Sequence, residues 1–553
     1  MPKYKYKYEY PWVEVPDLKT VRELIENGHN HPDGGDNVQY VFKEKKQEKK
    51  KTFNEVWYDT VGLGQYLYKH GMHEKKVAIL SENSYRWIAC FYAVMSGRYV
   101  LIPLDAKLMD GDLTEIMKRS KCDAIFYTKE FESAIEMMKA DEDVNLSLYI
   151  KIEDFDKIIE EGHADIAAGN KSYLDFKPEP EDLATIVFTS GTTGKSKGVM
   201  LTHKNIMASA VASAKEIQGQ HAIGFLPMNH LFAWASALLL SNVFHVWGYI
   251  CPSLKTIADD IKNYNPQNIA GVPLLVETIY KSIWRKAEQS GRADKLRKGL
   301  KISNFLLKFG IDARRKLFKQ VRDGLGGELD YIVIGGAYLD PKYENGMEAL
   351  GIPIFGAYGT TECSPGVTMS TFEHHKTGSC GKPMLCCEVK INNPDENGVG
   401  EIFVKGDNVF KGYYEDPEAT ASVFDGDWFM TGDYGYFDEE GYLFFVGRKK
   451  NLIVLSNGKN VAPEEIEDFL KVKIEYIHEV LVYEDDQDIL AAEFFLNTEE
   501  FPDAKERIDA DVKAVNKELP VYKRIHKVVV RDKEFEKTTT LKIKRKYLTE
   551  AKK

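Results

Sequence analysis

One stretch of the chain combines glycines, hydroxyl side chains and lysines at a spacing that suits phosphate binding. It follows the apolar run 185–189 and consists of Ser190, Gly191, Thr192, Thr193, Gly194, Lys195, Ser196, Lys197 and Gly198. Glycines let backbone N–H groups fold around an anion, hydroxyls add donors, and lysines supply positive charge. A Walker-type loop would need a glycine at position 189, where this chain has Thr189. The segment therefore predicts a polyphosphate-binding loop of another type.

Length and composition indicate a large globular protein with more than one domain. The chain has 553 residues, of which 43% are hydrophobic and 29% charged. A formal net charge of −11 disfavours general nucleic-acid binding, which needs a basic surface. The seven cysteines form no Cys-x-x-Cys pair, so we expect neither a zinc site nor a disulfide framework. This cysteine usage favours a reducing compartment, and we expect the cytosol.

The longest stretch without charged residues raises the question of a membrane span. Residues 217–254 contain no Asp, Glu, Lys or Arg, and 231–250 is long enough to cross a bilayer. However, His230 and Asn242 interrupt the stretch and Pro252 ends it. Polar groups inside a bilayer are costly. We therefore expect helices and strands buried in a large core rather than a membrane span.

Strand-like and helix-like patterns alternate through most of the chain. Valine- and isoleucine-rich runs predict strands at 76–80, 99–103 and 185–189, and a helical pattern covers 85–96. This alternation is typical of βαβ units in a parallel sheet. Past residue 448 the pattern changes, with a helix expected from Pro463 and strands near 480–482 and 490–495.

These patterns predict an α/β protein with two domains. A large, multi-sheet N-terminal domain with parallel βαβ units is expected over 1–449, and a small α+β C-terminal domain over 450–553.

The segment 295–322 reads as a basic amphipathic helix broken at Gly310. It combines Leu300, Ile302, Phe305, Leu306, Phe309, Leu317 and Phe318 with seven or more lysines and arginines. We favour a surface helix that packs on its own core, and a helix lying on a membrane surface is the second interpretation.

Together with the phosphate loop, six further motifs follow in an order that resembles the adenylate-forming superfamily, which includes acyl-CoA synthetases, luciferases and peptide adenylation domains. They lie at 225–230, 335–337, 358–362, 431–433, 447–450 and 537–542. The resemblance extends over residues 50–550. Residues 412–414, 428–433 and 457–463 are most similar to long-chain fatty acyl-CoA synthetases.

The resemblance implies sites for ATP and Mg²⁺. It assigns to ATP the residues Thr189, Ser190, Gly191, Thr192, Thr193, Gly194, Lys195, Gly336, Ala337, Tyr358, Gly359, Thr360, Asp433 and Arg448. Small residues after an apolar strand suit a flat adenine at Gly336 and Ala337, and Tyr358 offers a ring for stacking. An acidic residue beside a polyphosphate needs a bridging cation, so Glu362, together with Thr189, is expected to hold Mg²⁺.

Further roles follow from the same resemblance. Thr361 would donate a hydrogen bond to the α-phosphate or the acyl carbonyl, and Asp433 and Arg448 would bind the ribose. His230 matches the position that orients the acid's carboxylate, although a lone histidine in an apolar run is more often a core residue.

The acid itself is expected to meet mostly small or apolar residues. Trp234, Val272 and Gly356 would border the acyl pocket, with simple core packing as the alternative for Trp234.

In the C-terminal domain the resemblance implies a mobile unit. Lys542 is the expected catalytic lysine, Lys450 the hinge, and Gly458 and Lys459 part of a tunnel for CoA. Three positions depart from the family pattern: Glu536 and Leu541 stand where Pro and Gly are usual, and Asn451 follows the hinge pair where an acid is common.

The expected activity is ATP-dependent ligation of a carboxylic acid, a medium- to long-chain fatty acid, to CoA through an acyl-adenylate. Two alternatives stay open: an adenylating enzyme that loads a carrier-protein thiol, and a non-catalytic AMP-binding protein. The expected partners are small molecules and no nucleic acid; peripheral membrane contact and a homodimer are left open.

Overall fold

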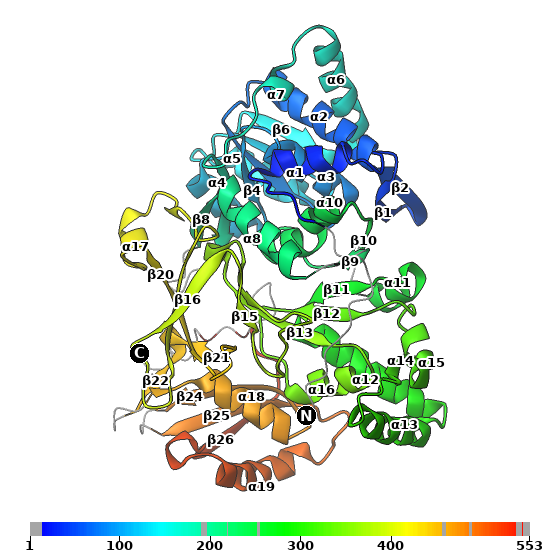
Figure 1. Cartoon of the computed structure of the whole chain (residues 1–553). Coiled ribbons are helices and arrows are strands. Elements are labelled where there is room, and N and C mark those ends of the chain that lie inside the picture. Colours follow the sequence, from blue (N-terminus) through cyan, green and yellow to red (C-terminus); the bar gives the residue numbers. More distant parts are fainter. Residues whose placement is uncertain are drawn as a thin grey trace. The chain divides into compact units, whose positions relative to one another are not determined.

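A computed structural model of the chain describes residues 14–189, 196–217, 219, 221–251, 255–455, 460–485, 489–537, 543 and 545 (Figure 1). The chain folds into two compact units. The first contains Met1–Val389 and Val404–Phe429, and the second contains Lys390–Phe403 and Met430–Lys553. The expected division into 1–449 and 450–553 stays a prediction.

One sheet of the first unit has seven strands and carries the strands that flank the phosphate loop. Its order is β18 (Gly412–Tyr413), β8 (Lys197–Thr202), β7 (Leu183–Thr189), β4 (Val100–Pro103), β3 (Lys76–Leu80), β5 (Ala124–Tyr127) and β6 (Leu148–Lys151). The five strands from β7 to β6 run parallel, as the alternating pattern predicts. β7 and β8 pair as antiparallel neighbours, with Thr189 opposite Lys197.

Six helices precede, connect or follow the strands of this sheet. They are α2 (Phe53–Lys69), α3 (Tyr85–Met95), α4 (Asp110–Ser120), α5 (Glu132–Ala140), α6 (Phe155–Ala167) and α8 (His203–Glu216). Helix α3 confirms the helix expected at 85–96 and is buried almost throughout. Its N-cap is Ser84, whose side chain accepts a hydrogen bond from the Trp87 N–H.

A second sheet of the same unit has nine strands. Its order is β15 (Lys382–Pro383), β14 (Gly366–Met369), β13 (Ile354–Gly359), β12 (Tyr331–Ile334), β11 (Asn268–Gly271), β9 (Ala222–Gly224), β10 (Gly248–Ile250), β1 (Val38–Glu44) and β2 (Gln47–Thr52). From β13 to β1 all neighbours are parallel. Its core includes Ile269, Ile332 and Ile354, which are fully buried.

The charge-free stretch forms core elements, as expected. It contains α9 (Leu231–Ala233), the π-helical segment η3 (Trp234–Leu239) and α10 (Leu240–Phe244) between β9 and β10. Leu231, Trp234 and Val243 are buried. Within the part of the chain that the structure describes, no helix is both long and apolar enough to cross a membrane.

Between β11 and β12 the chain makes a long helical excursion. It forms α12 (Pro273–Gln289), α13 (Ala293–Leu307), α14 (Arg314–Leu317) and α15 (Lys319–Asp323). The break expected at Gly310 is confirmed: α13 ends before it, and Gly310 has a φ of 74°. The excursion is followed, after β12, by α16 (Pro341–Ala349).

The second unit has its own core. One sheet of this unit consists of β24 (Ile477–Glu484), β25 (Leu490–Leu496) and β26 (Lys527–Arg531). The unit also contains the helices α18 (Pro463–Lys473) and α19 (Ala504–Val515). Leu470, Val480 and Phe494 are among its fully buried residues. The helix expected from Pro463 and both expected strands are confirmed.

Candidate active site

Four neighbouring parallel strands bring most of the expected residues of the first unit to one edge. These strands lie side by side in the order β9, β11, β12 and β13, and all four run in the same direction. Their carboxyl ends lead into 225–230, 272–273, 335–337 and 360–362. Ligands bind at the carboxyl ends of parallel strands in α/β proteins. His230, Val272, Gly336 and Glu362 therefore come from four strand ends of one sheet.

The end of β12 leaves backbone exposed. Gly336 has a φ of 81°, a left-handed conformation that favours glycine, and a Cβ there would meet nothing within 4 Å. Ala337 is exposed as well. Tyr358, on the neighbouring strand β13, is only 8% exposed. An open, side-chain-free surface thus follows β12, while most of the Tyr358 ring is already packed.

Two glycines of β13 allow close backbone contacts. A Cβ at Gly359 would lie 1.8 Å from the Pro365 carbonyl oxygen, and one at Gly356 would lie 2.4 Å from the Ser379 carbonyl oxygen. Both distances exclude any other residue without a backbone shift. At Gly356 the space that the sequence reserves for an acyl chain is taken by backbone in this structure, and its role in the acid pocket stays a prediction.

The carboxylate of Glu362 is connected to the flank of the phosphate loop. Glu362 lies in the short 3₁₀ turn η4 (Thr361–Cys363), directly after β13. The Tyr413 hydroxyl donates to Glu362 Oε1 at 3.0 Å. Lys197, the first residue of β8, places its Nζ 4.5 Å from the centroid of the Tyr413 ring. One aromatic ring therefore links the acidic turn to the strand that follows the glycine-rich loop.

The protonation of Tyr413 follows from this setting. Burial raises the pKa of the hydroxyl, and the negative charge of Glu362 raises it further. The tyrosine thus remains a hydrogen-bond donor at neutral pH. It fixes one oxygen of the carboxylate; in the described part of the chain no hydrogen bond is made to the other, Oε2. The Thr360 hydroxyl, two residues before Glu362, is buried and has no hydrogen-bond partner there either.

The turn that carries Glu362 is held by the segment that follows β17 (Gly400–Gly406). The fully buried Asn408 donates from Nδ2 to the carbonyl oxygens of Cys363 and Gly366, at 3.2 and 2.6 Å. The Phe410 N–H donates to the Glu362 carbonyl at 2.8 Å. Sequence reasoning missed these contacts of Asn408 and Tyr413, because a lone asparagine or tyrosine carries no signal of its own. The one available clue was the Gly412-Tyr413-Tyr414 motif.

The segment before His230 is fixed by an asparagine from another strand end. Asn83 donates from Nδ2 to the Leu226 carbonyl at 2.8 Å and accepts from the Met228 N–H at 3.0 Å. The His230 side chain is partly exposed. Asn83 thus positions the chain segment just before His230.

Trp234 packs into the core beside this segment. Its Nε1–H donates to the Met228 carbonyl at 2.6 Å, and its ring centroid lies 4.8 Å from that of Phe91. The side chain is only 1% exposed. These contacts fit the core alternative stated for Trp234, and its part in an acyl pocket stays a prediction.

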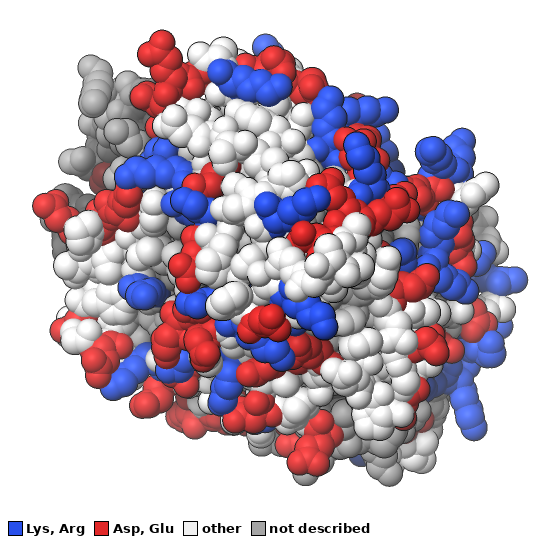
Figure 2. All heavy atoms as spheres, turned by 90° about the horizontal axis from the view of Figure 1, so that it is seen from above, with Lys and Arg blue, Asp and Glu red and all other residues white. Residues whose placement is uncertain are grey.

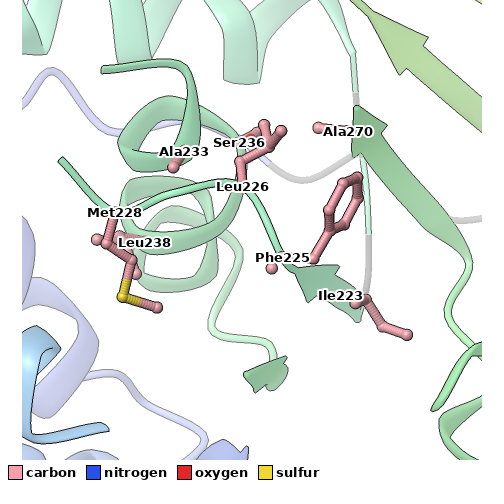
Figure 3. A pocket seen from close by; sticks show the side chains of 9 residues that line it. Ile223, Phe225, Leu226, Met228, Ala233, Ser236, Leu238 and Ala270 are labelled. Atoms are coloured by element: carbon pink, nitrogen blue, oxygen red, sulfur yellow. The ribbon is translucent and has the colours of Figure 1, made fainter. Parts of the chain in front are cut away.

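A small apolar pocket lies between β9 and η3 (Figure 3). It is lined by Ile223, Gly224, Phe225, Leu226, Met228, Ala233, Ser236, Leu238 and Ala270. In the figure the Phe225 ring stands next to the strand that carries Ala270. A second small pocket lies on η3 as well and shares Ser236 with the first. The first pocket adjoins the segment that leads to His230, because Phe225, Leu226 and Met228 line it.

In the second unit the expected ribose ligands lie together. Asp433 on β20 (Trp428–Phe437) is the register partner of Arg448 on β21 (Leu443–Arg448), and Arg448 Nε lies 3.6 Å from Asp433 Oδ1. The Asp433 N–H donates to the Thr431 hydroxyl at 3.1 Å. Burial, and then the charge of Arg448, lower the pKa of Lys450, the expected hinge.

The remaining site residues predicted from the sequence lie outside the part of the chain that the structure describes. They are Ser190, Gly191, Thr192, Thr193, Gly194, Lys195, Gly458, Lys459 and Lys542. Thr189 lies within the described residues, and its hydroxyl donates to the Lys197 carbonyl oxygen at 3.5 Å.

Comparison with known families identifies the chain. The AMP-binding enzyme family matches residues 29–414, and the AMP-binding enzyme C-terminal domain matches 450–551. The chain belongs to the AMP-binding enzyme family. The resemblance to adenylate-forming enzymes is thereby confirmed.

Proteins similar in sequence include fatty-acid ligases. The chain is 30% identical over 465 residues to long-chain-fatty-acid–CoA ligase 6 of Rattus norvegicus, covering 77% of this chain and 65% of that protein. It is 29% identical over 474 residues to fatty acyl-CoA synthetase A of Dictyostelium discoideum, covering 76% and 68%. The chain thus spans slightly less than two thirds of the rat protein.

Solved structures share the α/β fold. A fatty acyl-CoA synthetase of Mycobacterium tuberculosis matches with a TM-score of 0.68 and 21% identity, over 96% of this chain and 98% of that one. An anthranilate-CoA ligase in complex with anthranoyl-AMP matches with a TM-score of 0.77 and 18% identity, over 97% and 98%. O-succinylbenzoate-CoA synthetase of Bacillus subtilis, solved with ATP and magnesium ion, matches with a TM-score of 0.72 and 23% identity, over 95% and 98%. These likenesses confirm the predicted fold class: a large multi-sheet α/β part with parallel strands and a smaller α+β part.

Proposed function

We propose that the protein is an ATP-dependent acid–CoA ligase that forms an acyl-adenylate and acts on medium- to long-chain fatty acids. The observation that carries the proposal is the link from Glu362 through Tyr413 to Lys197, because it joins the acidic turn after β13 to the strand that follows the glycine-rich loop. Family membership and the fatty-acid ligases among the relatives support it.

The proposed reaction has two steps. A carboxylate oxygen of the acid attacks the α-phosphorus of ATP in line with the departing pyrophosphate, which leaves acyl-AMP. The CoA thiol, as it loses its proton, then attacks the acyl carbonyl, and AMP departs with the bonding electron pair. No protein nucleophile is needed, so the chain acts by positioning and by neutralising charge. Residues 190–195 would bind the phosphates, Thr361 would donate to the α-phosphate or the acyl carbonyl, and His230 would orient the carboxylate.

The residues around η4 fit a magnesium ion. Mg²⁺ in phosphoryl-transfer sites is typically held by one or two protein oxygens, with phosphate oxygens and water completing its shell. Glu362 offers a carboxylate oxygen fixed by Tyr413, and the buried Thr360 hydroxyl lacks a partner among the described residues. Glu362, with Thr189, would hold the ion. When bound, Mg²⁺ neutralises the negative charge of the polyphosphate.

The remaining assignments concern the nucleoside and the C-terminal domain. Gly336, Ala337 and Tyr358 would receive the adenine, and Asp433 and Arg448 the ribose hydroxyls. Lys542 would stabilise the α-phosphate during the first step. Rotation of the C-terminal domain about Lys450 would then bring Gly458 and Lys459 to the CoA tunnel.

The test uses purified full-length protein and two assays. Exchange of labelled pyrophosphate into ATP, measured with a panel of fatty, aromatic and short-chain acids, should depend on Mg²⁺ and be strongest with medium- to long-chain fatty acids. Free CoA added next should yield acyl-CoA and AMP. Labelling of a carrier protein but not of CoA would favour the carrier-loading alternative. Absence of exchange with every acid would leave an AMP-binding protein without catalysis and overturn the proposal.

A further inference from the structure

Helix α13 and the residues after it expose several large apolar side chains. Ile302, Phe305, Phe309 and Leu317 are 52%, 59%, 68% and 42% exposed. The rings of Phe305 and Phe309 contact each other edge to face, with centroids 5.1 Å apart. In Figure 1 α13 lies at the outer side of the excursion, next to α12, α14 and α15. We call these four residues the α13 patch.

The patch is not required to hold the helix on its own unit. The opposite side of α13 packs through Leu296 and Leu300 into a small core with Phe318, Leu350 and Trp284. At 100° per residue, Ile302 and Phe305 point away from Leu296 and Leu300 by more than a quarter of a turn. The helix therefore has two apolar faces, and its core uses only one. The sequence interpretation of a surface helix packed on its own core is correct for that one face.

The patch lies within the most basic segment of an acidic chain. Residues 295–322 contain ten lysines and arginines and one acid, Asp312, in a protein whose net charge is −11. Lys298, Lys301, Lys308 and Lys316 are exposed and form no ion pair among the residues that the structure describes. By contrast, Arg315 pairs with Asp330 and Lys319 with Asp323. Figure 2 shows another face, on which basic and acidic side chains are interspersed.

The lysines lie beside the phenylalanines rather than behind them. On a helix with 3.6 residues per turn, positions 298, 301, 302 and 305 fall within roughly 100° of arc. One strip of α13 thus presents Ile302 and the Phe305 ring, which contacts Phe309, flanked by the ammonium groups of Lys298 and Lys301. Side chains of this kind suit the boundary between lipid headgroups and acyl chains, since the rings enter the apolar region and the lysines extend to the phosphates.

We propose that the α13 patch docks on a membrane surface rich in anionic lipids. The charge selects this occupant: anionic headgroups complement the four lysines, whereas a second copy of the chain would present the same positive strip and repel it. The proposal is independent of the ligase proposal, because docking requires neither ATP nor an acid nor CoA. It gives the protein a position next to apolar molecules held in the membrane.

The test is co-sedimentation of the full-length protein with vesicles in the absence of ATP, acid and CoA. We expect it to bind vesicles of phosphatidylcholine with about 30 mol% phosphatidylglycerol more tightly than vesicles of phosphatidylcholine alone, because each lysine near such a surface favours binding roughly fivefold. Raising the salt concentration to about 1 M should weaken the binding, since the Debye length then falls to about 3 Å.

Two double variants locate the surface. Lys301→Glu with Lys308→Glu should lower affinity for the anionic vesicles by roughly thirtyfold or more, from the loss of two favourable charges alone. Phe305→Ser with Phe309→Ser should lower it by roughly tenfold or more, since each buried ring contributes to apolar transfer. All four side chains are exposed, so melting temperatures should stay near that of the wild type.

Matched controls change similar residues elsewhere in the same unit. Lys49→Glu with Lys50→Glu reverses two exposed lysines on β2, and Met109→Ser with Met137→Ser removes two exposed methionines. Both should retain vesicle binding. Equal binding to neutral and anionic vesicles, or equal losses in patch and control variants, would overturn the proposal. A dimer seen by sedimentation velocity without vesicles, and lost in Phe305→Ser with Phe309→Ser, would assign the patch to a second copy instead.

Discussion

At the scale of single residues, Glu362 carries the sharpest prediction. Its side chain is partly buried and accepts a hydrogen bond from the Tyr413 hydroxyl. Glu362→Ala should therefore lower Mg²⁺-dependent pyrophosphate–ATP exchange by about a hundred- to a thousandfold, a typical cost of losing one group that stabilises transition-state charge. The melting temperature should change little. Exchange at the wild-type rate under limiting Mg²⁺ would exclude the role of Glu362 in metal binding.

Tyr413→Phe tests the residue that orients this carboxylate. The variant keeps the ring under Lys197 and removes only the hydroxyl that donates to Glu362. A hydrogen bond to a charged group contributes about 1.5–3 kcal/mol, so the Mg²⁺ concentration needed for half-maximal exchange should rise by roughly tenfold or more. Exchange at saturating Mg²⁺ should recover most of its rate. An unchanged Mg²⁺ dependence would show that Tyr413 is structural only.

At the scale of elements, the loop between β14 and β15 is fastened to α16 by a buried ion pair and to the first residue of β13 by a hydrogen bond. His375 Nε2 lies 3.1 Å from Glu344 Oε1 and 3.0 Å from the Ile354 carbonyl oxygen, and Glu344 Oε2 accepts from the Gly378 N–H at 2.9 Å. Burial alone would lower the pKa of His375, but the hydrogen bond to Glu344 and the charges of Glu348 and Glu344 outweigh it. The pKa is therefore raised above 6.5.

A raised histidine pKa makes this fastening depend on pH. Its stabilising contribution is complete below the ordinary pKa and is lost as the pH rises through the raised pKa of the folded protein. His375→Gln should therefore lower the melting temperature more at about pH 6 than at about pH 9. His221→Gln is the matched control, because burial lowers the pKa of His221 and the trend should reverse. A pH-independent difference for His375→Gln would contradict the ion pair.

The sequence predicts the helices and strands more completely than it predicts which strand ends lie together at the candidate site. The alternation of strand and helix patterns predicts the parallel sheets, because burial on both faces leaves a strong apolar signal in each strand. Nothing local says that β9, β11, β12 and β13 are neighbours, since strand order is decided by packing between distant segments. For the same reason Asn83, Asn408 and Tyr413 were missed. Each of these residues makes its hydrogen bonds to a segment distant in sequence, which only the folded chain brings beside it.

At the scale of the whole molecule, substitution of Lys542 tests the proposed rotation of the C-terminal domain between the two reaction steps. If its ammonium stabilises charge in the first step, Lys542→Ala should slow adenylation by up to about a thousandfold, the equivalent of roughly 4 kcal/mol for unit charges about 4 Å apart at an effective dielectric constant of about 20. Ready-made acyl-adenylate and CoA should still give acyl-CoA at nearly the wild-type rate. Equal losses in both steps would contradict domain rotation.

The helical excursion from Pro273 to Asp330 begins at the carboxyl end of β11 and returns to the amino end of β12. Its two ends are fixed by the sheet, while its middle, which carries α13, contributes none of the residues assigned to ATP or metal. Substitutions there can accumulate over evolution without disturbing the sheet edge to which we assign the proposed ligase chemistry. Descendants of one ancestral enzyme could therefore gain or lose attachment to a lipid surface while inheriting the same chemistry.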